Sequence, residues 1–475
     1  MKKWYVWLIG AALLLIIAAG SVWIWAERYV AETTIPPNVK LSSWAVGGME
    51  IEQFKQEYTQ KLADLENTSI IFTFGPTDTA PVTTTLKQLG VTYEANKLFQ
   101  ALVKLEEGTL YERFNYRRNF PTDWSMSFQW DSQVWKQRFT AAWEEKTFGM
   151  PANASREINA QDQVIYTPDK KVYRLDRAQM EQLIRVAIPN EWSDKKELVI
   201  DAPLVSKDPA ITLEILKEEG IDRKIIEMVT NIKPGDEGRI HNIVAASDTI
   251  HDMVLKPDEI FDYDQVIAEA ERKYGFKEAP VILNGKLVPG IGGGICQVSS
   301  TLYNAALRTG LEIVERRNHS LPVAYLPLGL DATFSQGYLN FRFKNTTGKH
   351  MIIRTSTDNN RLTIKLFGTM DPAISYKMET KTIKVIQPTV KYVVNTSLPV
   401  GSQQVLQEGK QGYQVESYRI KLVDGKEVSR EKLATDTYKA QPKLIATNAG
   451  QANADSNTEH TTPIVEDGLN GPNFR

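Results

Sequence analysis

The chain has 475 residues, of which 42% are hydrophobic, and its 56 basic and 58 acidic residues give a formal net charge of −2. This length exceeds what one hydrophobic core usually holds, so we expect roughly two to four domains. The balanced net charge gives no sign of nucleic-acid binding, and no nucleic-acid partner is expected. Because the chain has 1 cysteine, a disulfide framework is excluded and the domains must depend on their cores.

The first element is an apolar stretch from Trp4 to Ala26 (residues 4–26) that contains no charged residue. About 20 such residues cross the hydrocarbon core of a bilayer. Lys2 and Lys3 precede the stretch, which favours a cytoplasmic N-terminus. A cleaved signal peptide is the alternative, but its apolar region usually has only about 7–15 residues. We therefore predict a cytoplasmic stub and transmembrane anchor over 1–31, with a single pass through the cell membrane and the bulk of the chain outside the cytoplasm.

Residues 38–108 combine short apolar runs typical of strands with helical spacing, which predicts an α+β domain. Val91 to Leu98 is similar in pattern to Tyr173 to Met180. In both segments an apolar alternation ends in an acidic residue, and a helical pattern follows. A duplicated α+β unit would explain this similarity, and so would two unrelated strand–helix joints.

From residue 240 onward, short strands and turns become dense. Residues 281–288 predict a β-hairpin, because the Asn-Gly pair at its centre readily adopts the positive φ angles of a tight turn. A glycine run follows, and then helical spacing from Ile295 to Arg308. Residues 374–447 predict a separate β module. Residues 448–475 are too polar to bury a core, and we expect a disordered tail.

Cys296 lies where the glycine run opens onto the predicted helix. A cysteine in the first turn of a helix faces the positive end of the helix dipole, which favours the thiolate. The glycines allow a sharp turn and the close approach of a substrate. The amides of Cys296 and Gln297 would point outward as oxyanion donors. The predicted oxyanion and substrate loop comprises Gly292, Gly293, Gly294, Gln297 and Ser299.

A thiol nucleophile needs a general base nearby in space. Of the 5 histidines, His319 follows a predicted strand, and Asp331 precedes the next strand-like stretch. This chain order is that of papain-like and transglutaminase-like thiol enzymes. We predict that Cys296 is the nucleophile, His319 the base and Asp331 the residue that orients the imidazole. His241 is the alternative base. Inert packing of the thiol, beside a structural His319 and a turn-capping Asp331, is the alternative to catalysis.

No cofactor and no metal site are expected. The glycine run lacks the Lys-Ser/Thr pair that follows in phosphate-binding loops. One cysteine and scattered histidines give no spacing typical of zinc ligands.

Residues 288–305, which include the glycine run and Cys296, resemble the hallmark of the VanW family, and residues 318–323 and 326–333 continue the match. The resemblance spans 238–370. Two upstream stretches depart from the family pattern. Pro257-Asp258-Glu259 stands where Pro-Gly-Glu is usual, and Phe261-Asp262-Tyr263-Asp264 where Phe-Ser-Phe-Asn is usual.

Residues 109–232 resemble, less specifically, the peptidoglycan-binding domain that often precedes VanW. Residues 374–447, with Gly409, Gly412 and Gly425, resemble the five-glycine module of cell-wall proteins, although some of the module's glycines are missing. The resemblance implies an envelope protein of the Gram-positive type that is associated with vancomycin resistance. Its implied partners are peptidoglycan stem peptides and glycan, and its implied reaction is L,D-transpeptidation.

Residues and resemblance together predict an α+β multidomain fold. It has an N-terminal transmembrane helix, an α+β wall-binding-like region, an α+β VanW domain with the papain/transglutaminase-like chain order, and a C-terminal all-β module. The predicted function is that of a membrane-anchored, extracytoplasmic cysteine acyltransferase, similar to an L,D-transpeptidase, that acts on stem peptides. A non-catalytic peptidoglycan-binding or scaffold protein is the alternative.

Overall fold

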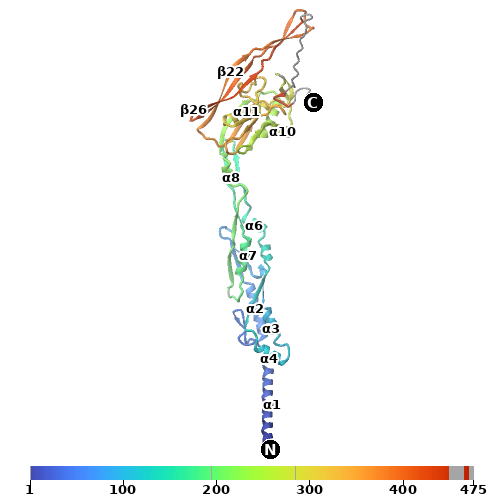
Figure 1. Cartoon of the computed structure of the whole chain (residues 1–475), viewed down its shortest axis with the longest axis vertical. Coiled ribbons are helices and arrows are strands. Elements are labelled where there is room, and N and C mark those ends of the chain that lie inside the picture. Colours follow the sequence, from blue (N-terminus) through green and yellow to red (C-terminus); the bar gives the residue numbers. More distant parts are fainter. Residues whose placement is uncertain (1, 194, 284, 449–464, 470–475) are drawn as a thin grey trace. The chain divides into compact units, whose positions relative to one another are not determined.

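The computed structural model describes residues 2–193, 195–283, 285–448 and 465–469 (Figure 1). The chain divides into two compact units. Unit 1 comprises residues 1–153 and 170–210, and unit 2 comprises residues 154–169 and 211–475. Both units combine helices and strands, so the expected mixture of α and β structure is confirmed.

Unit 1 begins with helix α1 (Lys2–Val30), in which the part from Lys3 onward is long and apolar enough to cross a membrane. Most apolar side chains of this helix are exposed, and among its described residues only Val30, at its end, is buried; Leu14 and Leu15, for example, are 69% and 71% exposed. A helix satisfies its own backbone hydrogen bonds, so exposed apolar side chains suit a hydrocarbon environment. The predicted apolar helix at the N-terminus is therefore confirmed.

The remainder of unit 1 is built from small sheets and short helices. Their bounds are β1 (Lys40–Leu41), β2 (Trp44–Ala45), α2 (Ile51–Glu66), β3 (Ser69–Thr73), β4 (Val82–Thr85), the 3₁₀ turn η1 (Lys87–Leu89), β5 (Val91–Glu94), α3 (Asn96–Val103), α4 (Leu110–Arg118), β6 (Asp123–Trp124), β7 (Ser127–Trp130), α5 (Ser132–Arg138), α6 (Ala141–Phe148), β10 (Val172–Leu175), α7 (Arg177–Ala187), β11 (Glu197–Asp201) and β12 (Leu204–Lys207).

Parts of the two segments that the sequence assigns to separate domains, 38–108 and 109–232, share one core in unit 1, whereas residues 154–169 and 211–232 lie in unit 2. Strand β11 pairs in parallel with β3, and β3 also pairs antiparallel with β4. Trp135 and Met180 are buried in the same cluster as Phe72. A domain boundary at residue 108 would divide this core. The two similar segments are each a strand followed by a helix (β5–α3 and β10–α7), as both interpretations of their similarity require.

Unit 2 carries the glycine run and the thiol. Its first part comprises β8 (Ser155–Ile158), β9 (Val164–Thr167), α8 (Leu213–Glu218), β13 (Arg223–Asn231), α9 (Glu237–Ile250), β14 (Met253–Leu255), β15 (Ile260–Asp262), α10 (Tyr263–Tyr274), β16 (Glu278–Leu283), β17 (Lys286–Ile291), α11 (Ile295–Arg308), β18 (Glu312–Glu315), β19 (Arg342–Lys344), β20 (Met351–Ser356) and β21 (Arg361–Gly368).

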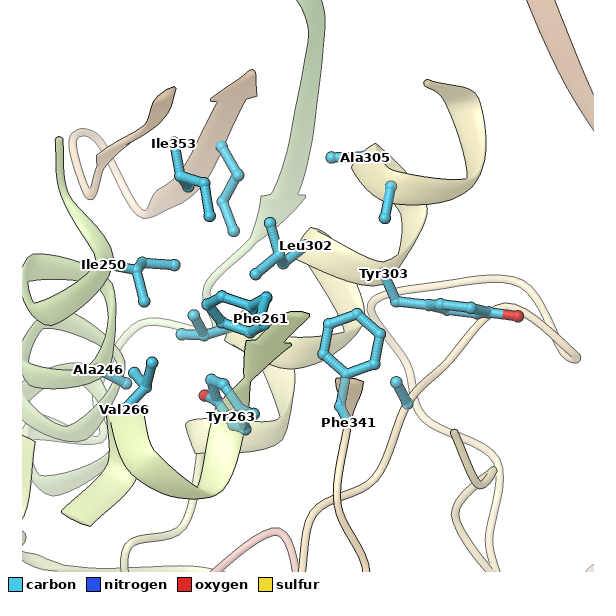
Figure 2. Packing of buried hydrophobic residues seen from close by; sticks show 14 of the residues in the cluster. Ala246, Ile250, Phe261, Tyr263, Val266, Leu302, Tyr303, Ala305, Phe341 and Ile353 are labelled. Atoms are coloured by element: carbon cyan, nitrogen blue, oxygen red, sulfur yellow. The ribbon is translucent and has the colours of Figure 1, made fainter. Parts of the chain in front are cut away.

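Helix α11 is the central element of unit 2, and all of its residues from Ile295 to Leu307 are buried. It packs against a four-stranded sheet of order β13-β21-β20-β14 and against helix α9. Figure 2 shows Leu302 and Tyr303 of α11 packed near the aromatic rings of Phe261 and Phe341. A helix buried on every side has little freedom to move, so its N-terminus holds Cys296 in a fixed position.

The predicted hairpin before the glycine run is present as β16 and β17, which pair antiparallel with Val281 opposite Val288. Asn284 of the turn lies outside the described residues.

The two upstream departures from the family pattern are compatible with the local structure at their positions. Asp258 has a φ of 63°, a left-handed angle that glycine adopts freely. Asp262 caps helix α10 by accepting a hydrogen bond from the Asp264 amide at 3.1 Å, a role that serine also fills.

The C-terminal β module is confirmed and contains two three-stranded sheets, of order β22-β25-β26 and β23-β27-β24. The long strands β22 and β26 are labelled in Figure 1. The bounds of these elements are β22 (Ile374–Ile386), β23 (Val390–Val394), β24 (Gln403–Gln407), β25 (Gly412–Val423), β26 (Lys426–Tyr438) and β27 (Lys443–Thr447).

The expectation of a disordered tail is wrong for residues 465–469. Strand β28 (Val465–Glu466) pairs antiparallel with β16, and Leu469 belongs to the main hydrophobic cluster of unit 2. A polar segment cannot form its own core, but it can add to the edge of an existing sheet. The other residues of the predicted tail beyond Asn448 lie outside the described residues.

Candidate functional site

Cys296 is the second residue of α11 and is fully buried. The turn that delivers it depends on glycine. Gly294 has a φ of 110°, and a Cβ atom on Gly293 would lie 2.5 Å from the carbonyl oxygen of Pro280. The sulfur accepts a hydrogen bond from the amide of Phe334 at 3.1 Å. The glycine run therefore brings a thiol to the N-terminus of a rigid helix, as predicted.

His319 and Asp331 lie together beside this thiol. The Nδ1 atom of His319 donates a hydrogen bond to Oδ2 of Asp331 at 2.6 Å, and the His319 amide donates to the same oxygen at 2.7 Å. Both residues are fully buried. The Nδ1 atom is occupied by the carboxylate. The other ring nitrogen, Nε2, has no hydrogen-bond partner among the described residues. The structure thus brings Cys296, His319 and Asp331 together.

The C-terminal module supplies part of the support for Asp331. The hydroxyl of Tyr438 donates to Oδ1 of Asp331 and accepts a hydrogen bond from the Gly329 amide at 2.7 Å. Arg316 donates to the Asp331 carbonyl at 2.7 Å and forms an ion pair with Asp436 at 2.7 Å. The side chains of Tyr438, Arg316 and Asp436 are buried, so the position of the Asp331 carboxylate is strongly determined.

These contacts shift the titration of the pair in opposite directions. Burial raises the pKa of Asp331, but the hydrogen bond and charge of His319, together with Arg316, outweigh burial and lower this pKa to about 2. Burial lowers the pKa of His319, yet Asp331 and Cys296 outweigh burial and hold it well above its ordinary value. The Asp331 carboxylate therefore stabilises the imidazolium that forms when His319 accepts a proton.

Asp467, which belongs to the described segment 465–469, contacts the first turn of α11. Its Oδ1 accepts hydrogen bonds from the amides of Cys296 at 2.9 Å and Gly294 at 3.2 Å, and its Oδ2 accepts one from Arg239 at 3.1 Å. The sulfur of Cys296, a ring nitrogen of His319 and a carboxylate oxygen of Asp467 lie within 4.8 Å of one another. Two amides therefore converge on one oxygen atom next to the thiol.

The predicted pair of free amides, those of Cys296 and Gln297, is wrong. The Cys296 amide binds Asp467, and the Gln297 amide donates to the carbonyl of Gly294 at 3.0 Å, a turn bond inside the glycine run. The side chain of Gln297 donates to the carbonyl of Asn231 at 2.9 Å and accepts from Arg239 at 3.1 Å. Gln297 therefore holds neighbouring elements together, and the amides that converge are those of Gly294 and Cys296.

Three other predicted residues have structural partners. Ser299 donates to the Ala332 carbonyl at 2.7 Å, which ties α11 to the segment that carries Asp331. His241, the alternative base, forms a hydrogen bond with the carbonyl of Gly275 at 3.0 Å. Gly292 has a φ of 89° and packs against Leu469. Of the two histidines weighed as base, His319 is the one in the group around the thiol.

The expectation of a thiolate does not hold in this state. Burial, followed by the negative charge of Asp467, raises the pKa of the Cys296 thiol above its ordinary value, although His319 acts in the opposite direction. The helix dipole favours the thiolate, but a carboxylate bound at the same helix terminus counteracts it. The thiol is therefore neutral while Asp467 is in place.

A cavity of about 850 Å³ adjoins the site. It is lined by residues of the β13–α9 connection, the β16–β17 hairpin and the segment after His319. Arg239, Gln297 and Asp467 link this cavity to the first turn of α11. Its lining combines apolar groups, such as Ile282 and Pro322, with charged ones. Such a groove suits a peptide-like ligand.

Cys296, His319 and Asp467 also provide ligand types that zinc accepts. Both carboxylate oxygens of Asp467, however, already accept hydrogen bonds. The donor to one of these oxygens is the Arg239 guanidinium. A fixed positive charge in contact with a ligand atom opposes the binding of a divalent cation. The arrangement fits acyl-transfer chemistry better than metal binding.

Sequence reasoning missed Asp467, Arg239 and Tyr438. Val465 and Leu469 were a signal for the first of these, because they are apolar residues on either side of Asp467 in an otherwise polar tail. For Arg239 and Tyr438 the sequence carries no comparable signal. Both lie far along the chain from the thiol, and they meet the site only through tertiary packing.

Comparisons with known proteins agree with this architecture. Residues 238–367 match the family described as "VanW like protein", and residues 377–448 match the G5 domain. Over 169 residues the chain is 38% identical to "Uncharacterized protein YoaR" of Bacillus subtilis, a match that covers 36% of this chain and 55% of that protein. Over 156 residues it is 28% identical to "Vancomycin B-type resistance protein VanW" of Enterococcus faecalis, which covers 32% of this chain and 57% of that protein. The chain thus spans little more than half the length of these relatives.

The C-terminal module has relatives of its own. Over 72 residues the chain is 39% identical to an immunoglobulin A1 protease of Streptococcus sanguinis, a match that covers 15% of this chain and 4% of that protein. The solved "IgA1 Protease G5 domain structure" is 33% identical, covers 17% of this chain and 96% of that one, and has a TM-score of 0.14. The chain contains a VanW-like domain over residues 238–367, followed by a G5 domain over residues 377–448.

Proposed function

We propose that this protein is a membrane-anchored, extracytoplasmic cysteine acyltransferase that acts on peptidoglycan stem peptides. The observation that carries the proposal is the buried group of Cys296, His319 and Asp331 at the N-terminus of α11, with Nε2 of His319 unpartnered among the described residues. Papain-like thiol enzymes use a nucleophile, a base and an orienting residue in this chain order.

In the proposed reaction, the Cys296 sulfur attacks the carbonyl carbon of a stem-peptide amide, and His319 takes the thiol proton. The negative charge that develops on the carbonyl oxygen is bound by the Gly294 and Cys296 amides, which already converge on one oxygen. The C–N bond then breaks, His319 returns the proton to the leaving amine, and a thioester remains. An amine of a second stem attacks the thioester, forms a new amide and releases the thiol, and His319 moves the proton between the two. With water as acceptor, the same residues give hydrolysis.

Two further observations support a site of action outside the cytoplasm, at the cell wall. Helix α1 is long and apolar enough to anchor the chain, and Lys2 and Lys3 favour a cytoplasmic N-terminus. The VanW relative is named for vancomycin resistance, and the G5 match supports a wall or glycan ligand for the C-terminal module. Residues 109–232 are proposed as a further peptidoglycan-binding region on resemblance alone.

The test is the cross-link composition of cell walls from cells that lack the protein and are complemented with variants. We expect Cys296→Ala and His319→Gln to leave the composition as it is without the protein. His241→Gln is the matched control, because His241 binds the Gly275 carbonyl instead, and it should restore the wild-type composition. If Cys296→Ala restores wild-type cross-links, the protein is not a transferase. The G5 match would then favour the non-catalytic wall-binding alternative.

A further inference from the structure

Residues 465–469 lie across the first turn of α11 as a short strand, Val465–Glu466, followed by a bend at Asp467. Glu466 pairs with Ile282 on β16, and Gly468 forms a parallel bridge with Ser335. The Leu469 amide donates to the Ile291 carbonyl at 2.7 Å. A strand that adds to the edge of a sheet in this way is a common mode of peptide binding.

The side chains of this segment engage the groups that the proposed reaction needs. The carboxylate of Asp467 takes both converging amides, those of Gly294 and Cys296, so it stands where the oxygen of a reacting carbonyl would lie. Glu466 accepts a hydrogen bond at 2.8 Å from the amide of Ser320, next to the proposed base.

The segment also fits its position closely. Val465, Asp467 and Leu469 are only 9%, 7% and 8% exposed, and a Cβ atom on Gly468 would lie 2.3 Å from Cγ1 of Val281. Asp467 itself has a φ of 58°, which aspartate tolerates better than most residues. The Cys296 sulfur beneath the segment is fully buried. A substrate carbonyl cannot take up the amides while Asp467 is bound to them.

We propose that residues 465–469 are an internal competitor that occupies the peptide-binding groove in front of Cys296, and that the substrate is an extended peptide which takes the same edge of β16 when the segment leaves. This inference rests on the proposed function for the nature of the groove. The structure described is then the closed state. The cavity of about 850 Å³ that borders Asp467 offers room for the rest of a substrate peptide.

The test measures the rate at which iodoacetamide alkylates Cys296 in the purified full-length chain. Gly468→Val expels the segment by a steric clash and keeps every charge. We expect alkylation to be faster by roughly tenfold or more, because the rate follows the population of the open form. Gly75→Ala is the control, since its Cβ atom would meet only Asp201 at an ordinary 3.6 Å, and it should react like the wild type. Equal rates for Gly468→Val and the wild type, within about twofold, would overturn the proposal.

Two further measurements complete the test. A synthetic peptide with the sequence of residues 463–470 should slow the alkylation of Gly468→Val again, whereas a scrambled peptide should not. In the wild-type chain, the Leu469 amide should exchange its hydrogen more slowly than it does in that free peptide, a readout that does not depend on the folding of a variant. Exchange as fast as in the free peptide would contradict the proposal. Alkylation requires only access to the sulfur, so this proposal can fail while the cross-link test of transfer succeeds, and the reverse also holds.

Discussion

Tyr438, the last residue of β26 in the G5 domain, donates its hydroxyl hydrogen bond to Asp331 of the VanW-like domain. The same hydroxyl accepts from the Gly329 amide at 2.7 Å, so it links two parts of the site. The G5 domain is therefore part of the support of the proposed active site. Under the proposed function, a G5 domain that binds the wall and also positions Asp331 would couple binding to reactivity.

Tyr438→Phe should weaken this support. The buried Asp331 carboxylate would lose one hydrogen-bond donor, which costs about 1–3 kcal/mol of the free energy of unfolding, and cross-linking should fall because the imidazole is held less well. Denaturant unfolding and wall analysis measure the two effects. Tyr418→Phe is the matched control, since Tyr418 donates to the surface carboxylate of Glu416. Equal effects of the two substitutions would show that the link to Asp331 has no special role.

Asp331→Asn should destabilise the fold in a pH-dependent way. The pKa of Asp331 is lowered to about 2 from its ordinary value of 3.8. The contribution of the carboxylate to the free energy of unfolding is therefore fully present above pH 3.8 and is lost as the pH falls toward 2. The raised pKa of His319 means that the contribution of the imidazolium is lost only as the pH rises through that raised value. The difference in free energy of unfolding between wild type and Asp331→Asn should therefore be large near about pH 5 and shrink toward about pH 2. A constant difference over this range would exclude a charged pair.

Asp467→Asn should make the thiol more acidic. Burial and then the charge of Asp467 raise the pKa of Cys296, and the substitution removes the second cause while it keeps the shape of the side chain. The midpoint of iodoacetamide alkylation against pH should move to lower pH. Asp358→Asn, in the exposed turn between β20 and β21, is the control. An unchanged midpoint in Asp467→Asn would mean that this carboxylate does not act on the thiol.

Gly293→Ala should disrupt the turn that carries the thiol. The added Cβ atom would lie 2.5 Å from the Pro280 carbonyl oxygen and 2.8 Å from the Ala279 carbonyl carbon, both of which belong to backbone that cannot rotate away. Overpacking of this kind costs about 1–3 kcal/mol, which thermal unfolding would detect as a lower midpoint. Gly75→Ala again serves as the control. A variant as stable as the wild type would show that the glycine run tolerates side chains.

Much of the fold follows from local sequence patterns. The apolar helix, the β16–β17 hairpin and helix α11 were all predictable, because each depends on the composition or periodicity of one short segment. The proximity of Cys296, His319 and Asp331 was predicted from chain order, and their catalytic roles stay predictions. Chain order is informative here because short connections keep successive elements close in space.

The parts that sequence reasoning missed depend on long-range contacts. The composition of a segment indicates whether that segment can form its own core, and the composition of the tail shows that it cannot. Composition does not indicate whether Val465 and Leu469 can pack on a surface that the rest of the chain forms. The occupied amides follow from that docking, and the charge of Asp467 adds to burial in raising the pKa of the Cys296 thiol. Asp258 and Asp262, in contrast, depart from the family pattern, but Asp258 adopts a left-handed angle that glycine also adopts, and Asp262 caps helix α10 as serine also can.

The central claim is that the Cys296 sulfur forms a thioester with a stem peptide. Mass spectrometry of the intact, purified full-length chain after incubation with a peptidoglycan stem peptide tests it most directly. We predict an adduct with the mass of the acyl fragment on the wild-type chain, its location on Cys296 after digestion, its loss on treatment with hydroxylamine, and no adduct on Cys296→Ala. An adduct of the same yield on Cys296→Ala, or transfer of the acyl group by that variant, would contradict the account.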